Sequence, residues 1–580
     1  MSDTVKKATE QLHPLIIDAL GRAVAEGELP EEAIPAFNIE IPANRDNGDY
    51  STNLAFVCAK AFRCAPRKIA DAVAKHIDLN GTYFSDCSVA GAGFINFTLA
   101  GEFYADVLLD IKNSGENYGR SDYGKGKRVN VEFVSANPTG PMHIGNARGG
   151  ALGDCLAAVL SAAGYEVERE FYINDAGNQI EKFGMSLDIR YQQLHLGENA
   201  PELPEDSYHG ADIIERAKEF SEIYGDEYIN KSEAERRKAL VDFALPKNIE
   251  GLKTALGAYR INYDTWFHES ELHKGAIKEV VDILTANGMT YEKDGALWYK
   301  NKEVQTKKLL SQGKTQEQID KLELKDDVLI RQNGNPTYFA ADIAYHRNKL
   351  VDRGFDKAID VWGADHHGHV ARLKGALDSI GLDGDRLDIV LMQLVNLVKD
   401  GKPVKVSKRS GNAITLVDLL DEVPVDAARF FFNLREPGST IDFDLGLAVS
   451  ENSQNPVYYC QYANARIHSI IRKVEADGIS LRDCTRDELK ALNAPEEIEL
   501  IRHLAAFTEE IVAAAKNYDP AKITRYCIDL ATLFHKFYNA CRVAVEDEKL
   551  MQARLTLCSC VSMVLTNILT MFSISAPESM

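Results

Sequence analysis

The spacing of hydrophobic and polar positions changes along the chain, and each change predicts a different kind of fold. Residues 1–115 begin with a helical pattern and end with an alternating strand over residues 93–99, which predicts a small α+β domain. Residues 113–126 are rich in Gly, Ser, Asn and Asp, which is typical of a linker. Residues 451–580 have a helical pattern throughout, so we expect a separate all-α bundle there.

Strands and helices alternate between these regions, over residues 116–400. The pattern predicts a strand at 128–134, a Pro/Gly loop at 135–142, a helix at 146–163 and a second strand at 166–173. Such a βαβ unit implies an α/β, Rossmann-like core with a parallel sheet that binds ligands at the carboxyl ends of its strands. Residues 185–260 are charged and helical, and we interpret them as an insertion into this core.

The alternation resumes over residues 326–400. Strands at 328–331 and 337–340 flank an Asn-Gly-Asn turn, which predicts a hairpin. A helix, a strand at 358–362, a helix at 369–380 and a strand at 388–398 follow, and Lys399-Asp-Gly-Lys402 predicts a second hairpin. We interpret residues 401–450 as a loop and a connecting segment that lead into the bundle.

Composition narrows the classes of protein to which the chain can belong. Of its 580 residues, 45% are hydrophobic and 26% are charged, which is close to a globular average and excludes a wholly disordered chain. Its 66 Lys and Arg against 87 Asp and Glu give a net charge of −21, so any surface that binds nucleic acid must be a local basic patch. Its ten cysteines form no C-x-x-C pair and the N-terminal residues lack the apolar core of a signal peptide, so we expect reduced thiols and a cytoplasmic location.

One apolar segment, residues 555–574, carries no charge and is long enough to span a bilayer. Small hydroxyl side chains recur in it every three or four positions and place a polar stripe on one helix face. We therefore predict a buried helix of the bundle and no association with membranes. The hydroxyl positions are Thr556, Ser559, Ser562, Thr566, Thr570 and Ser573.

A first motif with residues suited to phosphate chemistry is Asn137-Pro-Thr-Gly-Pro-Met-His-Ile-Gly-Asn146. It lies between the first predicted strand of the core and its helix, where free N–H groups attract phosphate. His143 can donate to phosphate oxygens, and Gly145 lets a ribose or an adenine lie against the backbone. An ordinary loop histidine beside a helix cap is the alternative.

A second motif, Lys405-Val-Ser-Lys-Arg409, is followed by Ser410-Gly411-Asn412. Three cations within five residues of a Ser/Gly loop would form a cationic flap. Such a flap can close on a pentacovalent phosphorus and the departing pyrophosphate, where negative charge grows. A solvated basic loop is the alternative.

Together the two motifs resemble the paired motifs of class I aminoacyl-tRNA synthetases. The resemblance extends, nearly end to end, to arginyl-tRNA synthetases of bacterial type through VEFVSANPTGPMHIGNARGGALGD, YINDAGNQI, TYFAADIAYH, VWGADHHGHV and NPVYYCQYANARI. Asn146 replaces the His of the class pattern; its amide can donate a hydrogen bond but carries no charge. Val406 replaces the Met that is usual in the second motif. Both flap lysines, Lys405 and Lys408, are kept.

The resemblance implies an arginine–tRNA ligase that joins L-arginine to tRNA(Arg) through an arginyl-adenylate and releases AMP and pyrophosphate. Mg²⁺ would arrive with ATP, bound mainly by phosphates and water, and we expect no structural metal and a monomer. Rate would come from positioning and charge stabilisation, with no protein nucleophile. The residues expected to act in catalysis are His143, Asn146, Lys405 and Lys408.

The guanidinium of arginine presents a planar fork of donors that favours carboxylates and carbonyl acceptors. Glu132 on the first strand of the core and Asp342 after the predicted strand at 337–340 are suitable acids. An exposed strand acid is the alternative for Glu132, and a helix N-cap is the alternative for Asp342. The positions that the resemblance implies for arginine are Glu132, Asn137, His143, Tyr338 and Asp342.

Three histidines lie in Gly363-Ala-Asp-His-His-Gly-His369, at a predicted strand end. Zinc ligation is one interpretation, although no Cys or acid recurs at ligand spacing. The resemblance instead implies that this turn lines the adenosine pocket, with Gly363 and Asp365 near the ribose and base and a histidine on an adenine edge. The expected ATP-binding residues are therefore His143, Gly145, Asn146, Gly363, Asp365, His366, His369, Val406, Ser407 and Lys408.

Residues 455–466 interleave aromatic side chains with amides and a base, a composition that can stack on unpaired nucleotides. A packed tyrosine cluster is the alternative here. A core strand residue is the alternative for Phe94, and a turn amide is the alternative for Asn96. Residues 425–430 resemble the DALR element that names the family's anticodon-binding domain, with Ala428 where Leu is usual. The expected tRNA-binding residues are Phe94, Asn96, Tyr459, Tyr462 and Arg466.

Two other classes of protein share part of this pattern. A stand-alone nucleotidyltransferase would contain the first motif but would need neither the helical tail nor the first domain. A non-catalytic tRNA-binding relative would have no use for a flap that binds pyrophosphate.

Overall fold

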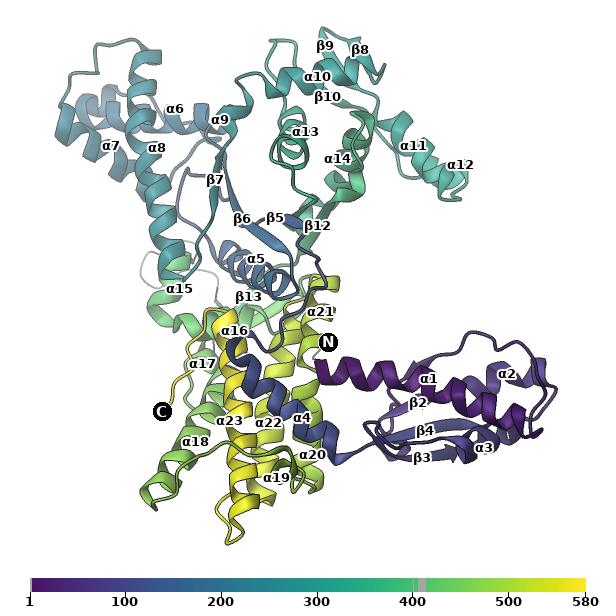
Figure 1. The fold of residues 1–580 in the computed structure, drawn as a ribbon. Helices are drawn as coiled ribbons and strands as arrows, with labels where there is room; N and C mark the ends of the chain where they lie inside the picture. Colours follow the sequence, from purple (N-terminus) through teal and green to yellow (C-terminus); the bar gives the residue numbers. More distant parts are fainter. Residues whose placement is uncertain (1–2, 400, 405–413) are drawn as a thin grey trace.

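Five parallel strands form the central sheet of the computed structural model, which describes residues 3–399, 401–404 and 414–580 (Figure 1). Their spatial order is β12-β11-β5-β6-β7. After β5, the chain adds β6 and β7 on one edge of the sheet and later adds β11 and β12 on the other edge. The neighbouring strands β5 and β11 therefore border a topological switch point. Ligands of open parallel sheets bind outside the carboxyl ends of the strands at such a point. The strands are β5 (Arg128–Glu132), β6 (Glu166–Ile173), β7 (Thr265–His268), β11 (Lys357–Gly363) and β12 (Leu387–Met392).

Helix α5 (Ile144–Ala162) packs closely on this sheet because its inner face carries glycines. A Cβ on Gly153 would lie 2.1 Å from Cγ of Phe133, and one on Gly150 would lie 2.7 Å from Cδ1 of Ile261. Side chains at these positions would push the helix away from the sheet. The N-terminus of α5, which follows His143, is thereby held beside the end of β5.

Other elements of the core flank the sheet or form two small sheets. The predicted hairpin at 399–402 is confirmed, since Lys399 of β13 pairs with Lys402 of β14. The helices are α9 (Glu269–Leu272), α10 (Ala276–Ala286), α11 (Asn301–Ser311), α12 (Gln316–Asp320), α13 (Tyr338–Arg347), α14 (His367–Ser379), α15 (Leu416–Glu422), α16 (Val425–Phe432) and α17 (Leu445–Ala448). The strands are β8 (Thr290–Lys293), β9 (Ala296–Tyr299), β10 (Asp327–Ile330), β13 (Val395–Lys399), β14 (Lys402–Pro403) and β15 (Ile441–Asp444).

Three predicted strands differ from the structure. Residues 338–340 begin helix α13, because the side chain of Thr337 accepts a hydrogen bond from the backbone N–H of Ala340 and caps the helix. Residues 388–398 form two strands in different sheets, because the chain leaves the central sheet at Gln393, whose N–H bonds the carbonyl of Pro437 at 3.0 Å. The strand predicted at 128–134 ends at Glu132, because the next residues turn into left-handed backbone.

The charged segment predicted as an insertion forms three helices with a small apolar core of their own (Figure 1). The insertion is tied to the motif loop, since Nδ2 of Asn248 donates to the carbonyl of Pro138 at 2.9 Å. Its helices are α6 (Asn178–Leu196), α7 (Ala211–Tyr224) and α8 (Glu233–Ala258).

The N-terminal domain combines an antiparallel sheet of order β1-β2-β4-β3 with helices, as an α+β domain was predicted to do. Its last helix, α4, leaves that sheet and packs along the C-terminal bundle (Figure 1), where Asn567 donates to the carbonyl of Gly115 at 3.0 Å. The elements are α1 (Asp3–Ala25), β1 (Ile39–Glu40), β2 (Tyr50–Thr52), α2 (Leu54–Phe62), α3 (Pro66–His76), β3 (Phe84–Ala90), β4 (Phe94–Leu99) and α4 (Gly101–Ser114).

The C-terminal part is an all-α bundle, as predicted. The apolar segment lies in α23, the one helix of the described residues that is long and apolar enough to cross a membrane. Most of that helix is buried in the bundle, and Ser562 on it donates to Oδ1 of Asn464 at 2.7 Å. The prediction of a bundle helix is confirmed. The helices are α18 (Pro456–Ala476), α19 (Arg486–Leu489), α20 (Pro495–Ala505), α21 (Phe507–Asn517), α22 (Ala521–Ala540) and α23 (Glu548–Met571).

Candidate active site

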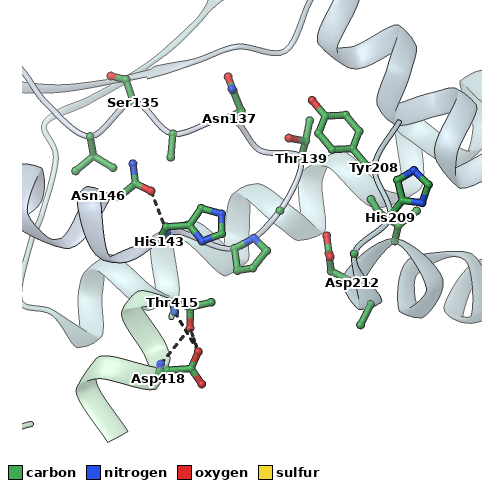
Figure 2. A pocket seen from close by; sticks show the side chains of 17 residues that line it. Ser135, Asn137, Thr139, His143, Asn146, Tyr208, His209, Asp212, Thr415 and Asp418 are labelled. Carbon is green, nitrogen blue, oxygen red and sulfur yellow. Dashed lines mark hydrogen bonds between the residues drawn. The ribbon is translucent and has the colours of Figure 1, made fainter. Parts of the chain in front are cut away.

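A cavity of about 1110 Å³ opens beside the carboxyl end of β5 (Figure 2). The motif loop after β5 and the first turn of α5 form one wall, the insertion forms a second, and the start of α15 forms a third. The polar side chains that line it are those of Ser135, Asn137, Thr139, His143, Asn146, Tyr208, His209, Asp212, Thr415 and Asp418.

His143 stands at the N-cap of α5, and its exposed ring points into the cavity in Figure 2. Its backbone N–H donates to Oδ1 of Asn146 at 3.0 Å, so that the amide oxygen of Asn146 holds the turn in place. A Cβ on Gly145 would meet no atom within 4 Å. The glycine therefore faces open space beside the helix N-terminus, where a nucleotide could approach the backbone.

The chain that follows the second motif pairs directly with the first motif. Ile144 donates its N–H to the carbonyl of Ile414 at 3.2 Å, and Leu416 donates to the carbonyl of Met142 at 2.9 Å. His143 and Thr415 thus form an antiparallel bridge between segments that are about 270 residues apart. Lys405, Val406, Ser407 and Lys408 lie outside the described residues.

Strained backbone connects β5 to the motif loop. Val134 and Ser135 have φ angles of 69° and 40°, in the left-handed region that β-branched residues rarely adopt. The Ser135 hydroxyl donates to Oε1 of Glu132 at 2.9 Å and accepts from the N–H of Tyr172 at 3.1 Å, and these bonds hold the turn. Such strain is concentrated at functional sites.

Glu132 is buried behind this turn, so the alternative of an exposed strand acid is wrong. Its Oε2 accepts from Nζ of Lys349 at 2.6 Å, and the same ammonium lies 3.0 Å from Oδ1 of Asp360. Burial disfavours the charged form of Lys349, but Asp360 and Glu132 outweigh burial and raise its pKa. Lys349 therefore stays charged, and part of the Glu132 carboxylate is already neutralised within the protein.

Asp342 lies in the second turn of α13, and Thr337 caps that helix, so the N-cap alternative for Asp342 is wrong. Its Oδ2 accepts from Nε2 of His369 at 2.8 Å. The pKa of Tyr172 is raised first by burial and then by the negative charges of Glu269, Asp342 and Glu132. The charges of the two predicted acids and of a third acid therefore act on one half-buried phenol.

That third acid, Glu269, follows β7 directly and is 3% exposed. Burial raises the pKa of its carboxyl group, against a hydrogen bond from His273. Sequence analysis missed Glu269, although its position directly after a strand of a parallel sheet was a usable signal. Tyr338, which was predicted on a strand, is instead the first residue of α13, and it is 40% exposed.

The Gly363 turn follows β11, the strand next to β5. Asp365 and His366 project into solvent, with side chains 82% and 60% exposed, whereas His369 is turned inward onto Asp342. These histidines do not converge as a set of metal ligands; among the described residues such a group is formed by Glu26, Glu28 and His76 of the N-terminal domain.

The aromatic segment of α18 borders a separate cavity of about 390 Å³ in the bundle. Tyr459 and Tyr462 lie 4.9 Å and 5.8 Å, between ring centroids, from His535 of α22. Arg466 donates to the Tyr462 hydroxyl at 2.9 Å and covers the ring of Tyr538 at 4.6 Å. The segment thus presents aromatic faces to a cavity in addition to packing.

Phe94 and Asn96 differ in accessibility. Phe94 at the start of β4 is 41% exposed and packs on Phe56. Asn96 is 4% exposed and accepts a hydrogen bond from the Ser51 hydroxyl at 2.8 Å. Of the two, only Phe94 offers surface to a partner in this structure.

Comparison with known proteins identifies the architecture. A family model described as "tRNA synthetases class I (R), catalytic domain" matches residues 110–437, which contain the sheet, both motifs and the cavity. "Arginyl tRNA synthetase N terminal domain" matches residues 10–99, and "DALR anticodon binding domain" matches residues 460–580. Fold and site are therefore those of a class I aminoacyl-tRNA synthetase.

Full-length relatives specify the family. The chain is 52% identical to the arginine–tRNA ligase of Caldanaerobacter subterraneus and 50% identical to that of Ruminiclostridium cellulolyticum, with 100% of each chain covered. The Thermus thermophilus arginyl-tRNA synthetase structure has the same fold, with a TM-score of 0.70 at 22% identity over 98% of this chain and 100% of that one. The chain belongs to the arginyl-tRNA synthetase family. The stand-alone nucleotidyltransferase alternative is wrong, because the helical tail is an anticodon-binding domain.

Proposed function

We propose that the chain joins L-arginine to tRNA(Arg) at the expense of ATP. The arginine carboxylate attacks the α-phosphorus of ATP, and arginyl-adenylate and pyrophosphate form. A terminal ribose hydroxyl of tRNA then attacks the adenylate carbonyl carbon, a C–O ester bond forms, and the bond to AMP breaks. The products are arginyl-tRNA, AMP and a proton. The pairing of residues 142–144 with residues 414–416 carries the proposal, because it brings the chain that follows the second motif onto the first motif at the cavity.

For the first step, we propose that His143 and the N-terminus of α5 stabilise the phosphate charge that grows in the transition state. Lys405 and Lys408 would complete this charge stabilisation from the flap. Asn146 would act mainly by holding the His143 turn, since its amide oxygen is used there. Mg²⁺ would be bound by ATP phosphates and water. The proposed ATP contacts are His143, Gly145, Asn146, Gly363, Asp365, His366, His369, Val406, Ser407 and Lys408.

For arginine, we propose a pocket around Tyr172 in which Asp342 and Glu269 accept from the guanidinium and Glu132 adds negative charge. Three acids whose charges act on one half-buried phenol support this pocket, because a forked cation gains from several acceptors. Asn137 and His143 from the motif loop and Tyr338 from α13 would orient the rest of the amino acid.

For tRNA, we propose that Tyr459, Tyr462 and Arg466 contact the anticodon loop, because aromatic faces beside a cavity can stack on unpaired bases. Phe94 would contact another part of the tRNA; Asn96 would support that strand from within. We propose a cytoplasmic monomer. The ten cysteines are free thiols, which suits a reducing compartment.

Pyrophosphate exchange, measured with each of the 20 amino acids in the presence and absence of tRNA, tests the proposal. Of the 20 amino acids, only arginine is expected to support exchange. Exchange with another amino acid, or none with arginine and tRNA together, would contradict the proposal. Binding of tRNA without exchange would favour the non-catalytic relative.

A further inference from the structure

A group of metal-binding side chains lies in the N-terminal domain, away from the cavity described above (Figure 1). Glu26 and Glu28 follow helix α1, and His76 is the last residue of α3. One ligand atom of each residue lies within 4.8 Å of the ligand atoms of the other two. We propose that these three side chains bind a divalent transition metal, of which Zn²⁺ fits best. The metal would clip the end of α1 to the end of α3.

The imidazole of His76 points to a ligand at this place. Its side chain is 9% exposed, and its Nε2 has no hydrogen-bond partner in the part of the chain that the structure describes. The nitrogen faces two carboxylates, with Oε1 of Glu28 at 3.6 Å and Oε2 of Glu26 at 3.7 Å, too far for a hydrogen bond to either. A buried nitrogen without a partner costs free energy, and a cation held between it and the two carboxylates removes that cost.

The spacing of these atoms suits a tetrahedral metal. Zn²⁺ binds imidazole nitrogen and carboxylate oxygen at about 2.0–2.2 Å, so two tetrahedral ligands lie roughly 3.3–3.6 Å apart. The observed 3.6 and 3.7 Å require only a small movement of the carboxylates. An octahedral Mg²⁺ with bonds of about 2.0–2.1 Å would require neighbouring ligands roughly 2.9 Å apart. Imidazole as a ligand also favours Zn²⁺ over Mg²⁺.

Both carboxylates stand on a turn that the backbone fixes. Glu26 donates its N–H to the carbonyl of Arg22 at 3.0 Å, and Gly27 has a φ of 76°. Glu28 donates its N–H to the carbonyl of Ala23 at 3.0 Å. Helix α1 packs on α3, so this turn is held beside the imidazole. The ligands come from segments about 50 residues apart, so no local spacing marks the site and the sequence alone gives no reason to expect a structural metal.

Lys75 competes with a metal for one of the carboxylates. Its ammonium donates to Oε1 of Glu28, and its side chain is 62% exposed. Exposed ion pairs contribute little stability, so an ion that binds all three ligands can displace this ammonium. Lys75→Gln is therefore expected to bind Zn²⁺ more tightly than the wild type does.

The test titrates Zn²⁺ into the metal-free, full-length protein in competition with a chromophoric chelator. The wild type is expected to bind one Zn²⁺ at this site, and Glu26→Gln is expected to bind it at least about 10-fold more weakly, since even an outer partner of a metal ligand is worth that much. Glu26 is 60% exposed, so its replacement leaves the fold intact. Glu31→Gln is the matched control, because it removes the same charge from an exposed residue of the same segment that lies outside the group. This control is expected to bind Zn²⁺ as the wild type does.

X-ray absorption at the zinc edge separates this site from binding by the free cysteines. The spectrum is expected to show nitrogen and oxygen ligands at about 2.0–2.2 Å, whereas a sulfur shell at about 2.3 Å would overturn the assignment. The proposal also fails if Glu26→Gln binds Zn²⁺ as tightly as the wild type, if Glu31→Gln loses as much affinity as Glu26→Gln, or if Lys75→Gln binds more weakly than the wild type.

Discussion

Replacement of Asp342 by Asn tests the proposed arginine pocket. Oδ2 of Asp342 accepts from Nε2 of His369 at 2.8 Å, and the side chain is 32% exposed. In Asp342→Asn the amide oxygen can keep the bond to His369, but the NH₂ group then faces the guanidinium donors. A hydrogen bond to a charged group contributes about 1.5–3 kcal/mol, which corresponds to a loss of about 10- to 150-fold in kcat/KM for arginine. Partial exposure places the expected loss in the lower part of this range.

The assay is steady-state aminoacylation with arginine varied at saturating ATP and tRNA, followed by ATP varied at saturating arginine. The KM for ATP is expected to remain at its wild-type value. Asp352→Asn is the matched control, because Asp352 follows the same helix and pairs at 3.2 Å with Arg347. An unchanged kcat/KM for arginine, or an equal loss toward ATP, would refute the pocket around Tyr172.

Two further predictions concern the helix on the sheet and the buried ions. Gly145→Ala is expected to raise the KM for ATP without lowering Tm, because the added Cβ meets no protein atom within 4 Å. Gly153→Ala is expected to lower Tm, because its Cβ would lie 2.1 Å from Cγ of Phe133. A lower Tm in Gly145→Ala would contradict this reasoning. Burial opposes ionisation of Asp360, but Lys349 and His346 outweigh burial and lower its pKa to about 2. The stabilisation that the charged Asp360 gains from these two partners is therefore present above pH ~4 and is lost as the pH falls toward 2. Lys349→Met is expected to lower the free energy of unfolding by about 3–5 kcal/mol in urea titrations at pH 7.5 and by less at pH 5, where the unpaired carboxylates take up protons; an equal deficit at both pH values would contradict this.

Local periodicity predicted much of the fold. The strand at Glu166–Ile173 was predicted with its observed bounds, because its alternation is continuous and ends at turn residues. The strand at 337–340 was wrong, because a short aromatic run suits either strand or helix and the Thr337 cap decides between them. The strand at 128–134 was too long, because nothing local marks the left-handed backbone at Val134.

The candidate site was only partly accessible to sequence analysis. Motif residues such as His143 are recognisable because their spacing to glycines and a helix start is local. Glu269 was missed because the short strand before it, β7, was not predicted, and Tyr208 was missed because its segment has no pattern. Each becomes a site residue only through the elements folded around it. Glu132 was identified, but its buried partner Lys349, 217 residues away, was not.

The sequence by itself determined the order of elements, the two motifs and the arginyl-tRNA synthetase family, since these depend on neighbours within one helix turn or one strand. Tertiary structure alone decided that the chain after the flap pairs with the His143 turn and that the insertion closes the opposite side of the cavity. It also decided which acids are neutralised internally. The physical reason is that hydrophobic periodicity is a local property, whereas cavities and buried ion pairs arise from contacts between segments hundreds of residues apart.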